Sequence, residues 1–507
     1  IIGMREYVLP GWIDLMDPGG TTMSLHFSYP LAVLFLFLSC TFTLQSQLDD
    51  PSQDWKKYNI YQIVTDRFST SNPNITTNCP DLTKYCGGSW KGITLRLPYI
   101  QKMGFNAIWI SPIVKNNDIP GGSMGYHGYW MSDLSQVNPH FGTEQDLKDM
   151  VKAAHNEGIS VIVDVVANHV GPLLQEGDFS QFVSFPKPEY YHPKCDIKDW
   201  GNQTQVEVCR LSGLPDLDQK HPYVRSTLNN WITSILEEYN FDGVRIDTVP
   251  EVNIEFWKEW RALIGSQRYV TGEVFNGDVN YVGNYANTLG ATLSYPMYFT
   301  LLNVFAYGGS MFQIRQTLNA YAKAVKRPDL LSTFIDNHDN PRFLNRQSDM
   351  YKYKNALTYV IFAQGIPIIY YGTEQSFHGG ADPNNREILF NRFDDTTNLY
   401  QFIQLQLKYK NHYAASLTIT PHIECYVTDR FYAFSRDKFF VATTNVGTQG
   451  GTQTHTITFH PYSNGDVICD LFWGLGDCIT VRNNSFNVVL QHGESKVFVP
   501  KSWILKE

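Results

Sequence analysis

Strand-like and helix-like segments alternate between residues 58 and 371, and this alternation limits the possible folds more than any other feature. Residues 160–166 form an apolar run that suits a parallel strand covered on both faces. The expected strands are 58–65, 107–111, 160–166, 243–247, 269–273, 292–295, 331–336 and 366–371. The expected helices are 95–103, 144–157 with Thr143 as N-cap, 222–239, 254–264 and 350–363. Eight strands that alternate with helices predict a closed (β/α)8 TIM barrel of the α/β class.

Two segments interrupt this alternation. Residues 171–221 follow the third strand, contain two cysteines and lack helical periodicity, so we expect a small inserted domain there. Beyond about residue 417, short β-like runs at 430–435, 439–444 and 454–459 are separated by Gly- and Asn-rich turns. The sequence therefore predicts a catalytic barrel at 51–415, an inserted domain at 171–221 and a C-terminal antiparallel β-sandwich domain at 416–507.

The N-terminal part differs in composition from the rest. Residues 1–22 form an extension that no pattern explains, and residues 30–40 form an apolar block followed by polar residues. The block has the length of a signal-peptide core and is short for a membrane span, so we expect a signal peptide at 23–46. No Lys or Arg lies between Met23 and the block, which leaves a short membrane anchor as the alternative. We expect a secreted protein without membrane association after signal removal.

Charge and cysteine usage indicate which partners and which cellular compartment suit the protein. The chain has 40 Lys and Arg against 49 Asp and Glu and no basic stripe, which argues against nucleic acid as a partner. Cys40 lies in the predicted signal peptide and Cys425 has no near neighbour. Three local disulfides are expected at Cys79–Cys86, Cys195–Cys209 and Cys469–Cys478. Glycosylation sequons begin at Asn74, Asn202 and Asn483.

Ionisable residues gather where the predicted strands end. Active sites of such barrels lie at the carboxyl ends of the strands. Each residue alone has an ordinary structural explanation, such as a cap or, for Arg245 and Asp247, an ion pair. Together they favour glycoside cleavage, which needs one carboxylate at the sugar carbon and one protonated carboxyl at the leaving oxygen. The residues concerned are His169, Arg245, Asp247, Glu273, His338 and Asp339.

Several of these segments resemble the alpha-amylase family, glycoside hydrolase family 13. Residues 164–169, 243–247, 272–274 and 334–339 look like its four signature regions. Residues 214–218 resemble an extra region typical of fungal alpha-amylases, and 125–130 and 365–375 match two further motifs. The resemblance implies a secreted, monomeric enzyme that hydrolyses internal α-1,4 bonds of starch, glycogen and malto-oligosaccharides with retention of configuration.

The resemblance also implies roles for individual residues. Asp247 would be the nucleophile, Glu273 the general acid/base and Asp339 the transition-state stabiliser. The substrate-binding residues would be Tyr129, which stacks beneath the sugar, Trp130 of the same motif, His169, Arg245 and His338 at the cleavage point, and Asp382 and Arg386 at a more distal glucose. Retention predicts that the two catalytic carboxyls lie about 5 Å apart.

A structural Ca²⁺ between the inserted domain and the barrel is a further implication. Its ligands would be the oxygen donors of Asn168, Glu207 and Asp216 and the main-chain carbonyl of Glu251, and hard oxygen donors suit this ion. Without the resemblance, Asn168 and Asp216 would be interpreted as loop-capping residues.

Two positions depart from the family pattern. Pro250 and Glu251 stand where fungal members have Lys-His, which contact the leaving-group side of the substrate. This leaves a maltogenic amylase or an α-glucan transglycosylase open as the alternative. A family disulfide is also missing, with Val282 near its first position and no Cys near Lys326. A non-catalytic glucan-binding or membrane-partner protein of the same fold would be expected to lose a catalytic carboxylate, and all three are present.

Overall fold

The computed structural model describes residues 55–72 and 78–505. The predicted N-terminal extension and signal peptide, Cys40 and the sequon at Asn74 lie outside these residues. Within them, no helix is both long and apolar enough to cross a membrane.

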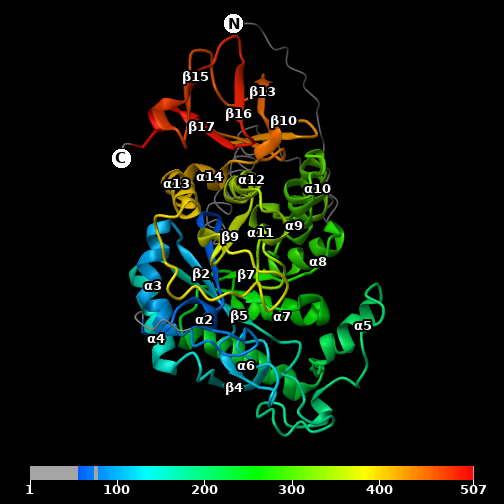
Figure 1. Cartoon of the computed structure of the whole chain (residues 1–507). Coiled ribbons are helices and arrows are strands. Elements are labelled where there is room, and N and C mark those ends of the chain that lie inside the picture. The colour runs from blue at the N-terminus through cyan, green and yellow to red at the C-terminus, as the bar shows by residue number, and fades with distance from the viewer. Residues whose placement is uncertain (1–54, 73–77, 506–507) are drawn as a thin grey trace, which may run out of the picture. The chain divides into compact units, whose positions relative to one another are not determined.

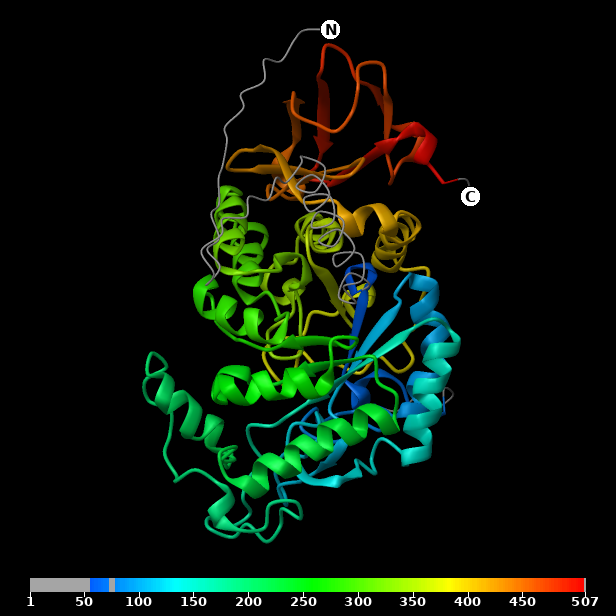
Figure 2. The ribbon, with the colours of Figure 1, turned by 180° about the vertical axis from the view of Figure 1, so that it is seen from behind.

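Seven parallel strands form one curved sheet in the order β7-β6-β5-β2-β1-β9-β8. Helices surround these strands (Figure 1), and the same arrangement is seen from behind in Figure 2. The (β/α)8 barrel prediction is confirmed. The strands are β1 (Ile60–Ile63), β2 (Ala107–Ile110), β5 (Ser160–Val165), β6 (Gly243–Ile246), β7 (Tyr269–Gly272), β8 (Ser332–Thr333) and β9 (Ile366–Tyr370).

The predicted strand at 292–295 is reduced to two isolated parallel bridges, from Thr292 to Gly272 and from Leu293 to Ser332. These bridges join the two edge strands β7 and β8 of the open sheet. Helix α9 (Tyr295–Leu301) begins at once, with Pro296 in its first turn. Proline favours the start of a helix and cannot donate to a strand ladder, which explains why the strand is so short.

Strand β8 is also shorter than the predicted 331–336. Its partner residue Thr333 lies opposite Pro367 of β9, which has no N–H to donate. Asp336, expected inside the strand, instead accepts a hydrogen bond from the main-chain N–H of Phe343. The chain therefore leaves the ladder early and reaches the residues around Asp339 as a loop.

The helices cover the outside of the sheet. Helix α4 starts with a capping box in which Thr143 and Asp146 each accept a hydrogen bond from the other's main chain, as the sequence predicted for Thr143. Helix α3 starts five residues before the predicted position, because Ser89 caps it by accepting from the N–H of Gly92. The other barrel helices include α6 (Pro222–Glu238), α7 (Ile254–Ile264), α8 (Val279–Leu289), α10 (Phe312–Ala324), α12 (Met350–Phe362) and α13 (Asn398–His412), with α3 at Trp90–Met103 and α4 at Glu144–Asn156.

The segment 171–221 is mostly irregular and contains the short helix α5 (Gln203–Val208). Isolated antiparallel bridges join His169 to Asp216 and Tyr191 to Leu217. A second insertion follows β2 and consists of the antiparallel strands β3 (Val114–Asn116) and β4 (Met131–Val137). The three predicted disulfides, Cys79–Cys86, Cys195–Cys209 and Cys469–Cys478, are confirmed, and Cys425 is free.

The C-terminal antiparallel β domain is confirmed as well. A six-stranded sheet runs in the order β10-β11-β12-β17-β14-β15, and β13 pairs with β16. Alternate residues of β11 face opposite sides: Tyr432 and Phe434 join the barrel core, whereas Phe431 and Ala433 pack in a second core with Val488. The strands are β10 (Ile423–Val427), β11 (Phe431–Arg436), β12 (Phe439–Thr444), β13 (Thr452–Ile457), β14 (Val467–Asp470), β15 (Cys478–Thr480), β16 (Phe486–Gln491) and β17 (Lys496–Pro500).

Candidate active site

The predicted catalytic carboxylates lie at the carboxyl ends of the barrel strands and share one cavity. Asp247 directly follows β6, Glu273 directly follows β7, and Asp339 lies in the loop after β8. The cavity has a volume of about 730 Å³. Its wall also contains Tyr129, Trp130, His169, Asp382, Arg386, Pro250 and Glu251 among the residues that the sequence singled out.

Arg245 organises the carboxylates. Its side chain is completely buried, and its Nη1 lies 2.9 Å from Asp164 Oδ1 and 2.6 Å from Asp247 Oδ1. Its Nη2 lies 2.8 Å from Glu273 Oε2. Arg245 is the register partner of Asp164 in β5, which is why the two side chains meet inside the barrel. Because Asp247 and Glu273 both contact one guanidinium, they must lie close to each other.

The charges in this cluster influence one another strongly. Burial by itself lowers the pKa of Arg245, but the carboxylates of Asp164 and Glu273 outweigh it and raise that pKa well above its ordinary value. Burial raises the pKa of Asp164 to about 6, against the opposing effect of Arg245. Burial likewise raises the pKa of Asp247, Arg245 lowers it, and the neighbouring carboxylates of Glu273, Asp164 and Asp339 raise it further. Arg245 is therefore the group that favours the ionised form of Asp247.

Glu273 is held by groups from two other segments. The main-chain N–H of Thr248 donates to Glu273 Oε2 at 3.3 Å, and the hydroxyl of Tyr295 donates to Oε1 at 3.4 Å. Trp257 in α7 donates to the carbonyl of Val249 at 2.7 Å, which anchors the turn that presents Thr248. The orientation of Glu273 is thus set by the turn after β6 and by the start of α9.

The two histidines are buried beside this cluster. His338 Nδ1 lies 2.7 Å from Gln62 Nε2, and its Nε2 lies 2.6 Å from the hydroxyl of Tyr129. Burial, with Arg386 and Arg245 nearby, lowers the pKa of His338 well below its ordinary value. Burial also lowers the pKa of His169 to about 4. Both rings are therefore neutral at physiological pH, and both ring nitrogens of His338 are engaged by Gln62 and Tyr129.

Asp339, Asp382 and Arg386 form a second charged group. Arg386 Nη2 lies 3.3 Å from Asp339 Oδ1, and its Nη1 lies 3.1 Å from Asp382 Oδ1. Tyr126 donates to Asp382 Oδ1 at 3.3 Å. Asp382 is half exposed, whereas Arg386 is buried. The Asp382 carboxylate is therefore accessible at the cavity wall, and the buried Arg386 holds it in place.

Three of the four predicted calcium ligands converge. One terminal amide atom of Asn168 lies 3.0 Å from Asp216 Oδ2 and 3.0 Å from the carbonyl oxygen of Glu251. If this atom is nitrogen, the amide donates to both oxygens; if it is oxygen, three oxygens face one point, as a hard cation requires. Glu207 is engaged elsewhere, because its carboxylate accepts from Gln203 at 3.1 Å and Asn253 at 3.0 Å. Across residues 55–72 and 78–505, no three or more His, Cys, Asp or Glu side chains form a metal-binding group.

Several residues of the site received no role from the sequence. Asp164 accepts from Trp109 Nε1 at 3.0 Å and from the hydroxyl of Tyr129 at 2.7 Å, in addition to pairing with Arg245. Gln62, Thr248 and Tyr295 contact His338 and Glu273 as described above. Asp164, Trp109 and Gln62 are polar groups inside buried barrel strands, and this pattern is the sequence signal that could have identified them.

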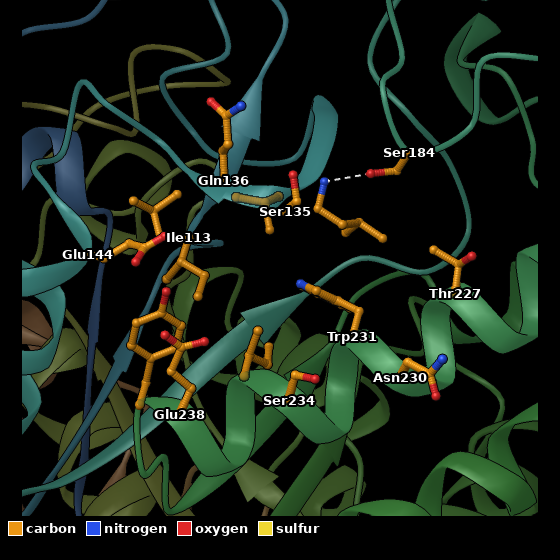
Figure 3. Close-up of a pocket in the computed structure, with 15 residues that line it drawn as sticks. Ile113, Ser135, Gln136, Glu144, Ser184, Thr227, Asn230, Trp231, Ser234 and Glu238 are labelled. Atoms are coloured by element: carbon orange, nitrogen blue, oxygen red, sulfur yellow. Dashed lines mark hydrogen bonds between the residues drawn. The ribbon is translucent and has the colours of Figure 1, made fainter.

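A separate hollow of about 320 Å³ lies between α6 and the β3–β4 pair (Figure 3). Its lining residues include Ile113, Gln136, Trp231 and Glu238. It contains none of the predicted catalytic, substrate-binding or calcium-binding residues, so we assign it no part in the chemistry described above.

Comparison with known proteins agrees with this geometry. Residues 62–414 match the sequence family described as the alpha amylase catalytic domain. Alpha-amylase 1 of Lipomyces kononenkoae is 39% identical over 388 residues, which cover 74% of this chain and 62% of the relative, less than two thirds of its length. The alpha-amylase of Saccharomycopsis fibuligera is 34% identical over 466 residues, covering 89% and 92%. The solved alpha-amylase of Malbranchea cinnamomea superposes with a TM-score of 0.85 at 35% identity, covering 89% of this chain and 98% of that one. This chain belongs to the alpha-amylase family, glycoside hydrolase family 13.

Proposed function

We propose that this protein is a secreted alpha-amylase that hydrolyses internal α-1,4-glucosidic bonds of starch, glycogen and malto-oligosaccharides with retention of configuration. The observation that carries the proposal is the buried Arg245, which contacts both Asp247 and Glu273 at the carboxyl ends of neighbouring strands. A carboxyl group paired with a guanidinium beside a second carboxyl group is the arrangement that retaining glycosidases need.

The chemistry assigned to these residues proceeds in two steps. Asp247 attacks the anomeric carbon while Glu273 gives its proton to the leaving glycosidic oxygen, so a covalent glycosyl-enzyme forms and the first chain leaves. Glu273, now ionised, takes a proton from water, and the resulting hydroxide displaces Asp247 from the same carbon. Both carboxyl groups return to their starting state. Asp339 stabilises the positive charge that develops on the sugar between these states.

The substrate-binding assignments rest on the same cavity. Tyr129 lines the cavity, and its hydroxyl is fixed by hydrogen bonds to Asp164 and His338. Aromatic rings of this kind pack against the apolar faces of sugars. Asp382 and Arg386 would bind a more distal glucose. Trp130 and His169 also line the wall.

Calcium and secretion belong to the proposal as well. Asn168, Asp216 and the carbonyl of Glu251 would hold a Ca²⁺, with Glu207 as a further ligand, and such an ion would tie the inserted segment to the strand ends. Three disulfides support an oxidising compartment. The exposed sequons at Asn202 and Asn483 support a glycosylated surface. We expect a monomer without nucleic-acid partners.

The test is hydrolysis of soluble starch by wild type, Asp247→Asn and Glu273→Gln, with products resolved over time. The proposal expects early products of mixed length, formed as the α-anomer, from wild type only. Wild-type hydrolysis no faster than that of Asp247→Asn would refute the enzyme assignment and leave the non-catalytic glucan-binding alternative.

The same experiment separates the second candidate function, a maltogenic amylase or α-glucan transglycosylase. Pro250 and Glu251 favour this candidate, because they line the cavity beside Glu273 in place of the family's Lys-His. Early accumulation of maltose alone, or of chains longer than the substrate, would select this candidate over the endo-hydrolase.

A further inference from the structure

Two aromatic side chains of the cavity wall are exposed, although both belong to residue types that folded proteins usually bury. Trp200 is 61% exposed and Phe275 is 53% exposed, and both line the 730 Å³ cavity that contains the catalytic carboxylates. Leu211 and Leu214 line the same cavity. Large apolar side chains that gather at an open cavity are typical of a wall that contacts a ligand. These residues therefore form an apolar part of the wall that is accessible to a substrate.

Trp200 stands on a short arm of the inserted segment, and this arm is fixed to the barrel. The Cys195–Cys209 disulfide closes the arm. Gln203 Nε2 donates to the carbonyl oxygen of Pro250 at 2.8 Å, and Gln203 Oε1 accepts from the hydroxyl of Tyr281 at 2.7 Å. Pro250 lies in the turn after β6, and Tyr281 lies in α8, which follows β7. The arm is thus held beside the ends of β6 and β7, so little freedom is lost when a ligand contacts Trp200.

The position of these aromatic residues relates them to the leaving group. Phe275 lies two residues after Glu273, the proposed proton donor to the leaving oxygen. The Asp382–Arg386 pair instead follows β9. Around the ring, β9 lies four steps from β6 in either direction, through β7, the bridges at 292–293 and β8, or through β5, β2 and β1. A glucan bound at Asp382 and Arg386 therefore crosses the catalytic carboxylates and reaches the aromatic residues on the opposite side.

We propose that Trp200 and Phe275 form an aromatic sugar-binding subsite on the leaving-group side of the cleaved bond. Aromatic rings pack against the apolar faces of glucose units, and a glucan is uncharged, which suits an apolar wall. Such a subsite holds the fragment that leaves with the reducing end. It therefore determines the length of that fragment. This inference rests on the proposed glucan hydrolysis.

The position of cleavage in maltoheptaose labelled at its reducing end tests the subsite. Without Trp200, the chain binds with more of its glucose units on the side of Asp382, so labelled products of Trp200→Ala should be shorter than those of wild type. We expect kcat/KM on maltoheptaose to fall about fivefold in this variant and to stay within about twofold of wild type in Trp200→Phe, which keeps an aromatic ring. Phe275→Leu, which keeps an apolar side chain against Tyr295, should shift the products in the same direction.

An exposed tryptophan outside the cavity supplies the matched control. Trp473 is 64% exposed and lies between β14 and β15 of the C-terminal domain. Trp473→Ala should keep both the product pattern and kcat/KM of wild type. Both Trp→Ala variants should unfold at the wild-type temperature, because substitutions at exposed positions change stability little. An unchanged product pattern in Trp200→Ala would overturn the proposal, as would an equal change in Trp473→Ala; an unchanged pattern in Phe275→Leu would remove Phe275 from the subsite.

A binding measurement separates this inference from the proposed function. In a Glu273→Gln background, maltoheptaose binding is measured by calorimetry with and without Trp200→Ala. A weaker affinity with Trp200→Ala supports the subsite even if wild type fails to hydrolyse starch, in which case only the proposed function falls. Hydrolysis by wild type together with equal affinities refutes the Trp200 contact alone.

Discussion

Replacing Asp164 by asparagine tests the electrostatics of the site most directly. The Asp164 side chain is fully buried, and its pKa is raised to about 6 by burial. The unfolded chain has a carboxyl pKa of about 3.9 at this position. Between these values the folded protein binds the proton more tightly than the unfolded chain, so the Asp164 contribution to stability is present at low pH and is lost as pH rises.

The size of this effect follows from the shift. About two pKa units at 1.36 kcal/mol per unit correspond to about 3 kcal/mol between pH 4 and pH 7. Asparagine does not titrate, so this pH dependence should disappear in Asp164→Asn. At pH 4 the folded Asp164 carboxyl is protonated and neutral like an asparagine side chain, so Asp164→Asn should change the free energy of unfolding little at that pH. As pH rises to 7, wild type loses about 3 kcal/mol that the variant keeps, so the variant should gain stability relative to wild type by that amount.

The assay is urea unfolding of wild type and variant, followed by tryptophan fluorescence at half-unit steps from pH 4 to pH 7. Asp178→Asn is the matched control, since Asp178 is exposed and hydrogen bonds from Ser180 lower its pKa. In that control, the stability of the variant relative to wild type should fall as pH rises, which is the opposite sign. A stability difference for Asp164→Asn that does not change with pH, or a variant that loses stability relative to wild type toward pH 7, would refute the reasoning.

Other groups give predictions of the same kind. Burial lowers the pKa of His422 to about 3, so its neutral form stabilises the fold above the unfolded pKa of about 6.5, and this stability is lost as pH falls. His422→Gln should remove about 3 kcal/mol of the acid destabilisation between pH 6.5 and pH 4; an unchanged pH profile in urea unfolding would contradict this. Chelation of calcium should lower the unfolding temperature by several degrees, and an unchanged melting curve in EDTA would count against the proposed ion. Asp382→Ala should raise KM for malto-oligosaccharides several-fold and change kcat little, because Asp382 contacts Arg386 and Tyr126 rather than the reacting carboxylates; a loss confined to kcat would argue against a distal sugar contact.

Local chain chemistry was sufficient to predict most of the architecture. The alternation of apolar runs and polar-faced helices predicted the barrel, because strands buried on both faces need continuous apolar residues. Thr143 predicted the start of α4 and the short cysteine spacings predicted three disulfides, because caps and local disulfides depend on residues close in sequence. The predicted strand boundaries were wrong where pairing with a neighbouring strand, and not the local sequence, determined them. Pro367 lies opposite Thr333 on the neighbouring strand and shortened β8. Residues 292–295 formed only two isolated bridges before α9 begins.

The sequence by itself determined which residues stand at the strand ends, since strand, loop and motif follow one another along the chain. Only the tertiary structure decided what those residues contact. It placed Asp164, Asp247 and Glu273 around one buried guanidinium and raised the pKa of Asp164 by removing it from water. It also gave Thr248 its strained backbone and its N–H contact with Glu273, which lies 25 positions further along the chain. Such properties depend on burial and on distances between remote segments, and no local pattern encodes either.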